Sequence, residues 1–269
     1  MKKTRPSAVS GYFYPAQKEV LKKEIESYLE NANGMLPKKP NAIISPHAGY
    51  VYSGPIAGYS YKVLVPYRDS YKKILILGPS HYEYVSGIAY TPVQYFETPL
   101  GMVEVDTEAI EIAKQFDLIV ERPSAHQKEH SIEVQIPFLQ FIFSKKISII
   151  PLAFGKVEPL KIFMLLKKLW SPELLILISS DLSHYYSYEE ASELDRKTSN
   201  AILNLDPDSI KEEQACGRIG IQGLLLFAKE KNWKAHLLDL RNSGDTAGRK
   251  NQVVGYGAWG FTDADSSSN

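Results

Sequence analysis

The sequence has little cysteine, no excess of charge and no long apolar run, and each shortage excludes a class of protein. A single cysteine, Cys216, excludes an intramolecular disulfide and fits a reducing compartment, so we expect a cytoplasmic protein. Lys and Arg together number 31, as do Asp and Glu, so no basic field argues for nucleic acid or an anionic membrane surface as a partner. No stretch approaches the roughly 18 apolar residues of a membrane span. No apolar segment follows the basic residues near Met1, so we expect no signal peptide.

The 269 residues instead show the alternating pattern of an α/β protein. The pattern predicts one α/β domain over residues 1–262, with a central mixed or mostly parallel sheet flanked by helices. The polar, Ser-rich residues 263–269 predict a disordered tail. Apolar runs predict strands at 41–45, 73–77, 85–90, 102–105, 147–152, 174–179, 235–240 and 253–261, and amphipathic segments predict helices near 18–32, 53–65, 107–116, 129–143 and 160–170, with two or three more between 188 and 231.

Three of these apolar runs end within a few residues of a histidine, although the chain has only six histidines. His47, His81 and His184 are the three residues concerned. Ligands bind at the carboxyl ends of strands in open α/β sheets. The spacing from His47 to His81 fits one β-α-β unit, which returns the second strand parallel to the first. If those two strands are neighbours about 4.8 Å apart, two imidazoles can share one ion. The pattern therefore predicts a metal site.

Two further residues have both a functional and a structural interpretation. Asp181 either caps the turn after its strand or accepts the second N–H of His184 or of a histidine ligand. Cys216 is either a buried small apolar residue or a thiolate at a helix N-terminus. As a thiolate it completes a His-His-Cys set that suits zinc, copper or iron. Arg218 either balances an anion there or is an ordinary surface residue.

The segment from His126 to Gln135 is also rich in chemical groups. On a helix, Glu129 and Glu133 share one face and His130 lies beside them, as a second ligand set or as a base that positions the first. The structural alternative is a helix with acidic residues in its first turn.

A second group of residues is predicted to border the site. The loop with Ser243 and Asp245 either covers a pocket or forms a surface turn. Four tyrosines beside the histidine motifs are predicted to form a pocket rim: Tyr50, Tyr52, Tyr82 and Tyr185.

Taken in order, these motifs make the chain resemble the Memo family, also called AmmeMemoRadiSam system protein B, which is similar to the LigB-like class III extradiol dioxygenases. The resemblance implies a single LigB-like α/β domain with its site at one end of the sheet. It rests on Pro46-His47-Ala48-Gly49-Tyr50, Gly78-Pro79-Ser80-His81, Glu129-His130-Ser131-Ile132-Glu133, Ser180-Asp181-Leu182-Ser183-His184, Cys216-Gly217-Arg218 and Asn242-Ser243-Gly244-Asp245.

The resemblance also implies roles for individual residues. His47 and His81 match the two iron-ligating histidines of the dioxygenases, and His184 matches their acid/base histidine. Cys216 stands where the dioxygenases have a glutamate ligand. Because two histidines and one carboxylate are the set that suits oxygen activation at iron(II), dioxygenase activity does not follow from the resemblance.

Three functions are therefore open at this point. The first is a metal-dependent redox protein with iron or copper, or zinc in their place. The second is a module that binds a peptide or small molecule, since the resemblance extends to phosphotyrosine-peptide binders of animal cells. The third is a metal-assisted hydrolase with His184 or Glu133 as base. The family name further implies a functional link to a radical-SAM protein.

Overall fold

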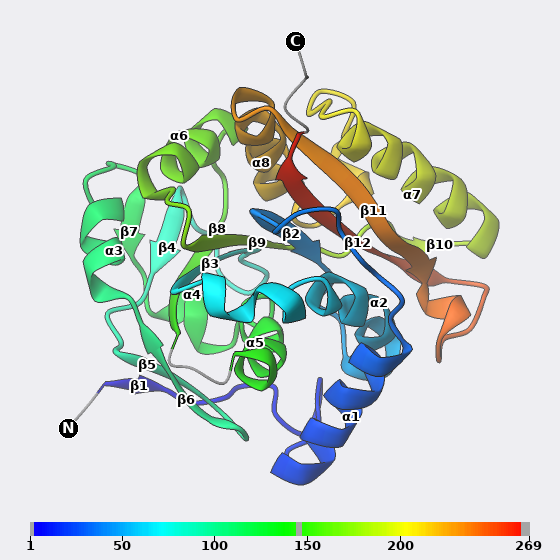
Figure 1. Ribbon diagram of the computed structural model, residues 1–269, viewed down its shortest axis with the longest axis horizontal. Helices are drawn as coiled ribbons and strands as arrows, with labels where there is room; N and C mark the ends of the chain where they lie inside the picture. The colour runs from blue at the N-terminus through cyan, green and yellow to red at the C-terminus, as the bar shows by residue number, and fades with distance from the viewer. Residues whose placement is uncertain (1–2, 144–146, 265–269) are drawn as a thin grey trace.

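The computed structural model describes residues 3–143 and 147–264, and within them a 12-stranded mixed sheet has helices on both faces (Figure 1). The strands are β1 (Thr4–Arg5), β2 (Ala42–Ser45), β3 (Lys73–Pro79), β4 (Ile88–Tyr90), β5 (Tyr95–Thr98), β6 (Gly101–Val105), β7 (Ile119–Glu121), β8 (Ser148–Phe154), β9 (Leu174–Ser179), β10 (His184–Tyr186), β11 (Trp233–Asn242) and β12 (Val253–Asp263). The helices are α1 (Lys18–Asn31), α2 (Tyr50–Lys62), α3 (Thr107–Ala113), α4 (Ser124–Gln127), α5 (Ile136–Ile142), α6 (Pro159–Leu169), α7 (Tyr188–Leu203) and α8 (Arg218–Glu230). Short 3₁₀ turns lie at η1 (Val65–Ser70), η2 (Glu133–Gln135), η3 (Glu212–Gln214) and η4 (Ser243–Asp245).

Four parallel strands form the centre of the sheet, in the order β8-β3-β9-β2. Their residues are buried almost throughout, which explains why they appear in the sequence as continuous apolar runs. Strand β12 adds antiparallel to β2, and β11 and β10 pair antiparallel with β12. The predicted α/β domain with a mixed central sheet is confirmed.

The helices form two layers that bury the sheet. Helices α1, α2 and α5 contact one another, and α2 also contacts β2, β11 and β12. Helices α6 and α8 pack together, and α8 contacts β3 and β9, while α7 covers β11 and β12. Figure 1 shows the first group below the sheet and α6, α7 and α8 above it. In α1 the apolar residues Leu21, Ile25 and Leu29 recur every four positions, which gives the helix one buried face.

Residues 129–143 depart most from prediction, because they do not form one helix. Glu129 lies in a loop that precedes η2, and α5 begins only at Ile136. The Gln135 N–H donates to the Ile132 carbonyl three residues back, so the chain makes a 3₁₀ turn before α5 begins. Pro137 lies in the first turn of α5, where its missing N–H costs nothing.

Smaller departures occur at other element ends. Helix α2 begins at Tyr50, three residues before the predicted start, and the Ser53 hydroxyl donates to the Ala48 carbonyl. Asp106 caps α3 by accepting from the Ala109 N–H at 2.8 Å. Strand β12 continues to Asp263, so this residue of the predicted tail is in a strand, and residues 265–269 lie outside the described residues. Among the described helices, none combines the length and apolar character that a membrane span requires.

Candidate metal centre

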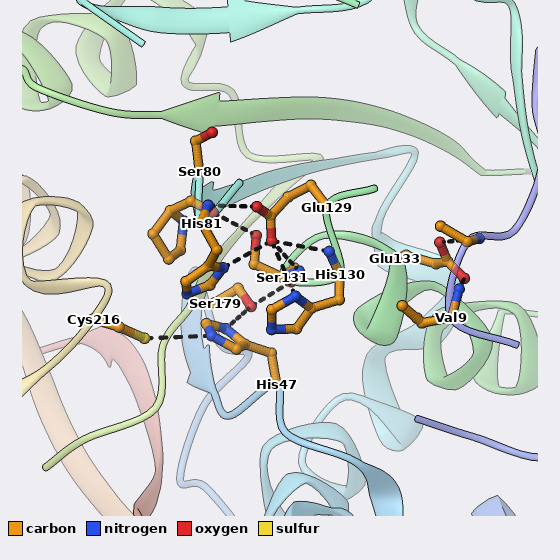
Figure 2. A network of polar contacts seen from close by, with 12 residues as sticks. Val9, His47, Ser80, His81, Glu129, His130, Ser131, Glu133, Ser179 and Cys216 are labelled. Carbon is orange, nitrogen blue, oxygen red and sulfur yellow. Dashed lines mark hydrogen bonds and ion pairs between the residues drawn. The ribbon is translucent and has the colours of Figure 1, made fainter. Parts of the chain in front are cut away.

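His47, His81 and Cys216 meet at the carboxyl edge of the parallel strands (Figure 2). His47 follows β2, His81 follows β3, and Cys216 precedes α8. The condition that the two strands be neighbours is not met, because β9 lies between β2 and β3. All three strands are parallel, so their carboxyl ends still share one edge, and the two imidazole centroids lie 5.2 Å apart.

The loop after β9 fixes the position of Cys216. The Asp181 N–H donates to the Cys216 Sγ at 3.3 Å, and the Cys216 N–H donates to the Asp181 carbonyl at 3.3 Å. The next residue, Gly217, allows this close approach, since a Cβ there would lie 2.5 Å from the Cβ of Ser180. The thiol is therefore held against the strand ends that carry the histidines.

The three candidate ligand atoms lie close enough for one ion. The Nε2 of His47 is 3.3 Å from the Sγ of Cys216, and all three ligand atoms lie within 4.8 Å of one another. An ion with bonds of about 2.0–2.3 Å to nitrogen and sulfur keeps its ligands roughly 3.3–3.8 Å apart in a tetrahedron. The His47–Cys216 pair already has this separation.

Glu129 holds His81 from behind. Its carboxylate lies 2.9 Å from the His81 Nδ1 and accepts the His81 backbone N–H at 2.6 Å. Burial alone would raise the pKa of Glu129, but the hydrogen bonds and charge of His81, with the N–H of Ser131, lower it to about 2. Because a carboxylate accepts, the His81 Nδ1 carries the proton and its Nε2 is left for a ligand.

Burial keeps His47 and Cys216 uncharged. It lowers the pKa of His47, an effect increased by the neighbouring His81. It also raises the pKa of the Cys216 thiol, and the Asp181 charge raises it further. The interpretation of Cys216 as a thiolate relied on a helix N-terminus to lower its pKa, but here desolvation outweighs that effect.

His184 and Asp181 lie beside this cluster. The His184 Nδ1 lies 2.8 Å from the Leu182 carbonyl, which can only accept, so this nitrogen carries a proton. Asp181 accepts the His47 backbone N–H at 2.7 Å and is the hydrogen-bond partner of neither predicted imidazole. Burial raises the pKa of Asp181. Asp181 therefore holds the backbone of His47 in place. The sequence had suggested a turn cap or an acceptor for a histidine side chain, and this role is neither.

His130 adds a third imidazole to the cluster. Its ring stacks on His81 with centroids 4.6 Å apart and packs against Phe13 and the edge of His47. Its Nδ1 lies 3.4 Å from a Glu129 carboxylate oxygen and has no hydrogen bond among the described residues. Burial and the nearby His47 lower the pKa of His130 to about 4. His130 is thus a neutral ring that walls the cluster.

Two clefts reach this group from different sides. The first, here called the His184 cleft, has a volume of about 440 Å³, and its lining includes Phe13, Tyr52, His130, Asp181, His184, Tyr185, Ser243 and Arg249. The second, here called the Tyr82 cleft, has a volume of about 460 Å³, and its lining includes His81, Tyr82, Tyr84, Lys156 and Cys216. They share none of their lining residues. The predicted residues Tyr52, Tyr82, Tyr185 and Ser243 therefore border clefts.

Tyr185 has an unusual backbone. Its φ of 65° lies in the left-handed region, at the irregularity where β10 pairs with β12. Residues other than glycine adopt this conformation at a cost, and they do so more often at functional sites. The side chain is 71% exposed and borders the His184 cleft.

Besides His47 and Glu129, four predicted residues line neither cleft. Tyr50 is buried in the core, where its hydroxyl donates to the Val134 carbonyl at 2.7 Å, so it is not a rim residue. Arg218 donates to Gln222 of its own helix at 3.2 Å. Asp245 accepts from the Tyr188 hydroxyl and the Asn242 N–H and so closes its own turn.

Glu133, the fourth, is fully buried and faces the N-terminal segment instead of the cluster (Figure 2). It pairs with Arg5 and accepts from the Tyr14 hydroxyl and the N–H groups of Ala8 and Val9. Since the predicted helix is absent, Glu129 and Glu133 do not share a face. A carboxylate with this many donors is a structural anchor, so the interpretation of Glu133 as a base is wrong.

Several residues of the site gave no recognisable signal in the sequence. Phe13 comes from the segment before α1, and Arg249 from the turn before β12. Ser179 and Gln135 bond to one another and, through Ser179, to His47. Ser179 ends a strand and Gln135 ends a 3₁₀ turn, and neither position distinguishes a site residue from an ordinary one.

Comparisons with known proteins agree with the motifs. The sequence model of the family described as Memo-like protein matches residues 5–259. A MEMO1 family protein of Sulfurisphaera tokodaii is 35% identical over 94% of this chain and 97% of its own. A MEMO1 family protein of Nitrosopumilus maritimus is 36% identical over 96% of this chain and 99% of its own. A MEMO1 family protein of Ignicoccus hospitalis is 35% identical over 96% of this chain and 98% of its own.

Proposed function

The chain belongs to the Memo-like family, and we propose that it binds one transition-metal ion, iron or copper, for redox chemistry. His47, His81 and Cys216 would hold the ion. The observation that carries this proposal is the convergence, within 4.8 Å, of two imidazoles and one thiol from three separate elements.

The donor set and its surroundings fit such an ion. Imidazole and thiolate together suit iron, copper or zinc more than magnesium or calcium. His81 has the carboxylate partner that orients most metal-ligating histidines, here Glu129 at 2.9 Å. A Cys216 thiolate and the Glu129 carboxylate together balance the charge of a divalent ion such as iron(II), copper(II) or zinc(II).

The neighbouring residues support chemistry on a bound molecule. An iron or copper ion supplies one-electron redox chemistry when bound. With its Nδ1 proton directed at the Leu182 carbonyl, neutral His184 presents a lone pair on Nε2 and can take up or return a proton in the His184 cleft. Phe13, Tyr52 and Tyr185 give that cleft aromatic walls against which the apolar part of a substrate packs.

Metal analysis of protein purified without a tag tests the proposal. We expect about one iron or copper ion per chain, and its loss in His47→Ala, His81→Ala and Cys216→Ala. His236→Ala is the matched control, because His236 lies in β11 bound to Thr262 and should leave the metal content unchanged. Wild-type protein that takes up neither iron, copper nor zinc would contradict the proposal.

A second candidate function is ligand binding without metal. The observation in its favour is that the His184 cleft is lined by none of His47, His81 and Cys216. Calorimetry with a phosphotyrosine peptide and its unphosphorylated form, on metal-free and metal-loaded protein, separates the two functions. Affinity that is unchanged by a chelator supports the binding module, and affinity that requires the ion supports the metal-dependent one.

A further inference from the structure

A buried hydrogen-bond chain runs from His47 into the core. The His47 Nδ1 lies 2.8 Å from the Ser179 hydroxyl oxygen, which is also 2.5 Å from the Ser131 carbonyl. The Gln135 side-chain nitrogen lies 2.8 Å from the same hydroxyl. Ser179 and Gln135 are both almost completely shielded from solvent. Water therefore does not supply alternative partners to this chain.

The direction of each bond follows from what each group can donate. A carbonyl only accepts, so the single proton of the Ser179 hydroxyl goes to the Ser131 carbonyl. The Gln135 amide is oriented by the Pro46 carbonyl, 3.0 Å from its nitrogen, and by the Tyr61 hydroxyl, which donates to its oxygen. Its NH₂ group therefore donates to Ser179.

The Ser179 oxygen is then left with one lone pair and no proton. It can only accept from His47, so the proton of the neutral imidazole must lie on Nδ1. The lone pair lies on Nε2, the atom 3.3 Å from the Cys216 Sγ. The opposite tautomer would set two lone pairs against each other at 2.8 Å in a buried site, unless the Ser131 carbonyl lost its donor.

We infer that Ser179, oriented by Gln135 and the Ser131 carbonyl, is a positioning residue that fixes His47 in its Nδ1–H tautomer and so presents Nε2 to a metal. The inference deepens the proposed function and rests on it for the consequence in metal binding. The tautomer itself is a property of the metal-free protein. The two statements therefore fail separately.

Nitrogen NMR of metal-free protein with ¹⁵N-labelled histidine tests the tautomer directly. The signals of His47 are assigned as those that disappear in His47→Gln. In the wild type we expect them to show a protonated Nδ1 and an unprotonated Nε2. In Ser179→Ala the signal should shift toward the other tautomer or toward a mixture. A wild-type His47 with its proton on Nε2 overturns the inference without any need for a variant.

Metal binding gives the second measurement. Loss of an outer-shell partner typically weakens metal affinity about 10–100-fold, and we expect a loss in that range for Ser179→Ala with iron(II) and with zinc(II). Ser45→Ala is the matched control, because Ser45 pairs with Ser179 in the β2–β9 ladder and is equally buried, but its hydroxyl lies beside Tyr61 and not against an imidazole. It should keep both the tautomer and the affinity.

The outcomes distinguish the two proposals. If the wild-type protein has the expected tautomer but does not bind metal, the proposed function is contradicted and the positioning role of Ser179 is not. Equal losses in Ser179→Ala and Ser45→Ala point to a general packing defect and overturn the inference. So does a Ser179→Ala protein that keeps the wild-type tautomer and affinity within twofold.

Discussion

Replacing Glu133 by glutamine should destabilise the fold without emptying the metal site. The Glu133 carboxylate is fully buried and forms an ion pair with Arg5. It also accepts hydrogen bonds from the Tyr14 hydroxyl at 2.5 Å and from the N–H groups of Ala8 and Val9 at 2.8 and 3.1 Å. Glutamine offers one acceptor oxygen in place of two, and its NH₂ group would face donors. Arg5, itself 5% exposed, would keep a buried charge without its partner.

The size of the effect follows from that geometry. Breaking a buried ion pair by removing one partner costs about 3–5 kcal/mol. For a domain somewhat larger than 150–250 residues, each kcal/mol lowers the melting temperature by roughly 2–4 °C, so we expect a decrease of about 6–20 °C. The control is Glu111→Gln, which loses only an exposed pair with Lys114 and should leave the melting temperature close to that of the wild type.

Urea unfolding followed by tryptophan fluorescence and circular dichroism gives the free-energy difference. Metal analysis of the folded protein should give the wild-type stoichiometry for Glu133→Gln, because Glu133 is not among the candidate ligands. The reasoning fails if Glu133→Gln unfolds at the same urea concentration as Glu111→Gln. It fails equally if the variant is stable but has lost its metal, since Glu133 would then act at the site after all.

Two further predictions concern protons. Because burial and the Asp181 charge raise the pKa of Cys216, metal binding must displace a thiol proton, so affinity should rise about tenfold per pH unit between pH 6 and 8. Calorimetry in buffers of different ionisation enthalpy counts that proton, and an affinity that does not change with pH over this interval would contradict the assignment of Cys216 as a ligand. For Glu129, whose pKa is lowered from its usual 4.5 to about 2, the stabilisation is complete above about pH 4.5 and is lost as the pH falls toward 2. The difference in unfolding free energy between wild type and Glu129→Gln should therefore narrow over that interval, and a constant difference from pH 6 to pH 2 would count against the assignment.

The sequence was informative wherever a local pattern decides the structure. Strand β9 was predicted at its observed ends, because a continuous apolar run between polar residues fits a strand buried on both faces. The meeting of His47 and His81 followed from the rule that parallel strands end at one edge. That rule holds even though β9 separates their strands, which is why the convergence was predictable and the neighbour relation was not.

The prediction of a single helix over residues 129–143 failed because Glu129 serves a distant part of the chain. Its carboxylate accepts the backbone N–H of His81, which lies 48 positions away, and Glu129 lies in a loop there. A sequence pattern contains no information on a distant partner of that kind.

The same limit explains why Ser179 was missed and what its position implies. A serine at the end of an apolar strand is indistinguishable by sequence from Ser45 at the end of β2, and the two are paired across the sheet. Only the folded chain shows that one hydroxyl lies against an imidazole and the other does not. Each candidate histidine ligand thus has a different acceptor on Nδ1, a carboxylate for His81 and a neutral hydroxyl for His47. An imidazole that donates its N–H to a carboxylate becomes more basic at its other nitrogen. Donation to a neutral hydroxyl has a smaller effect. The two histidines should therefore be unequal ligands, with His81 binding the more strongly to a metal ion.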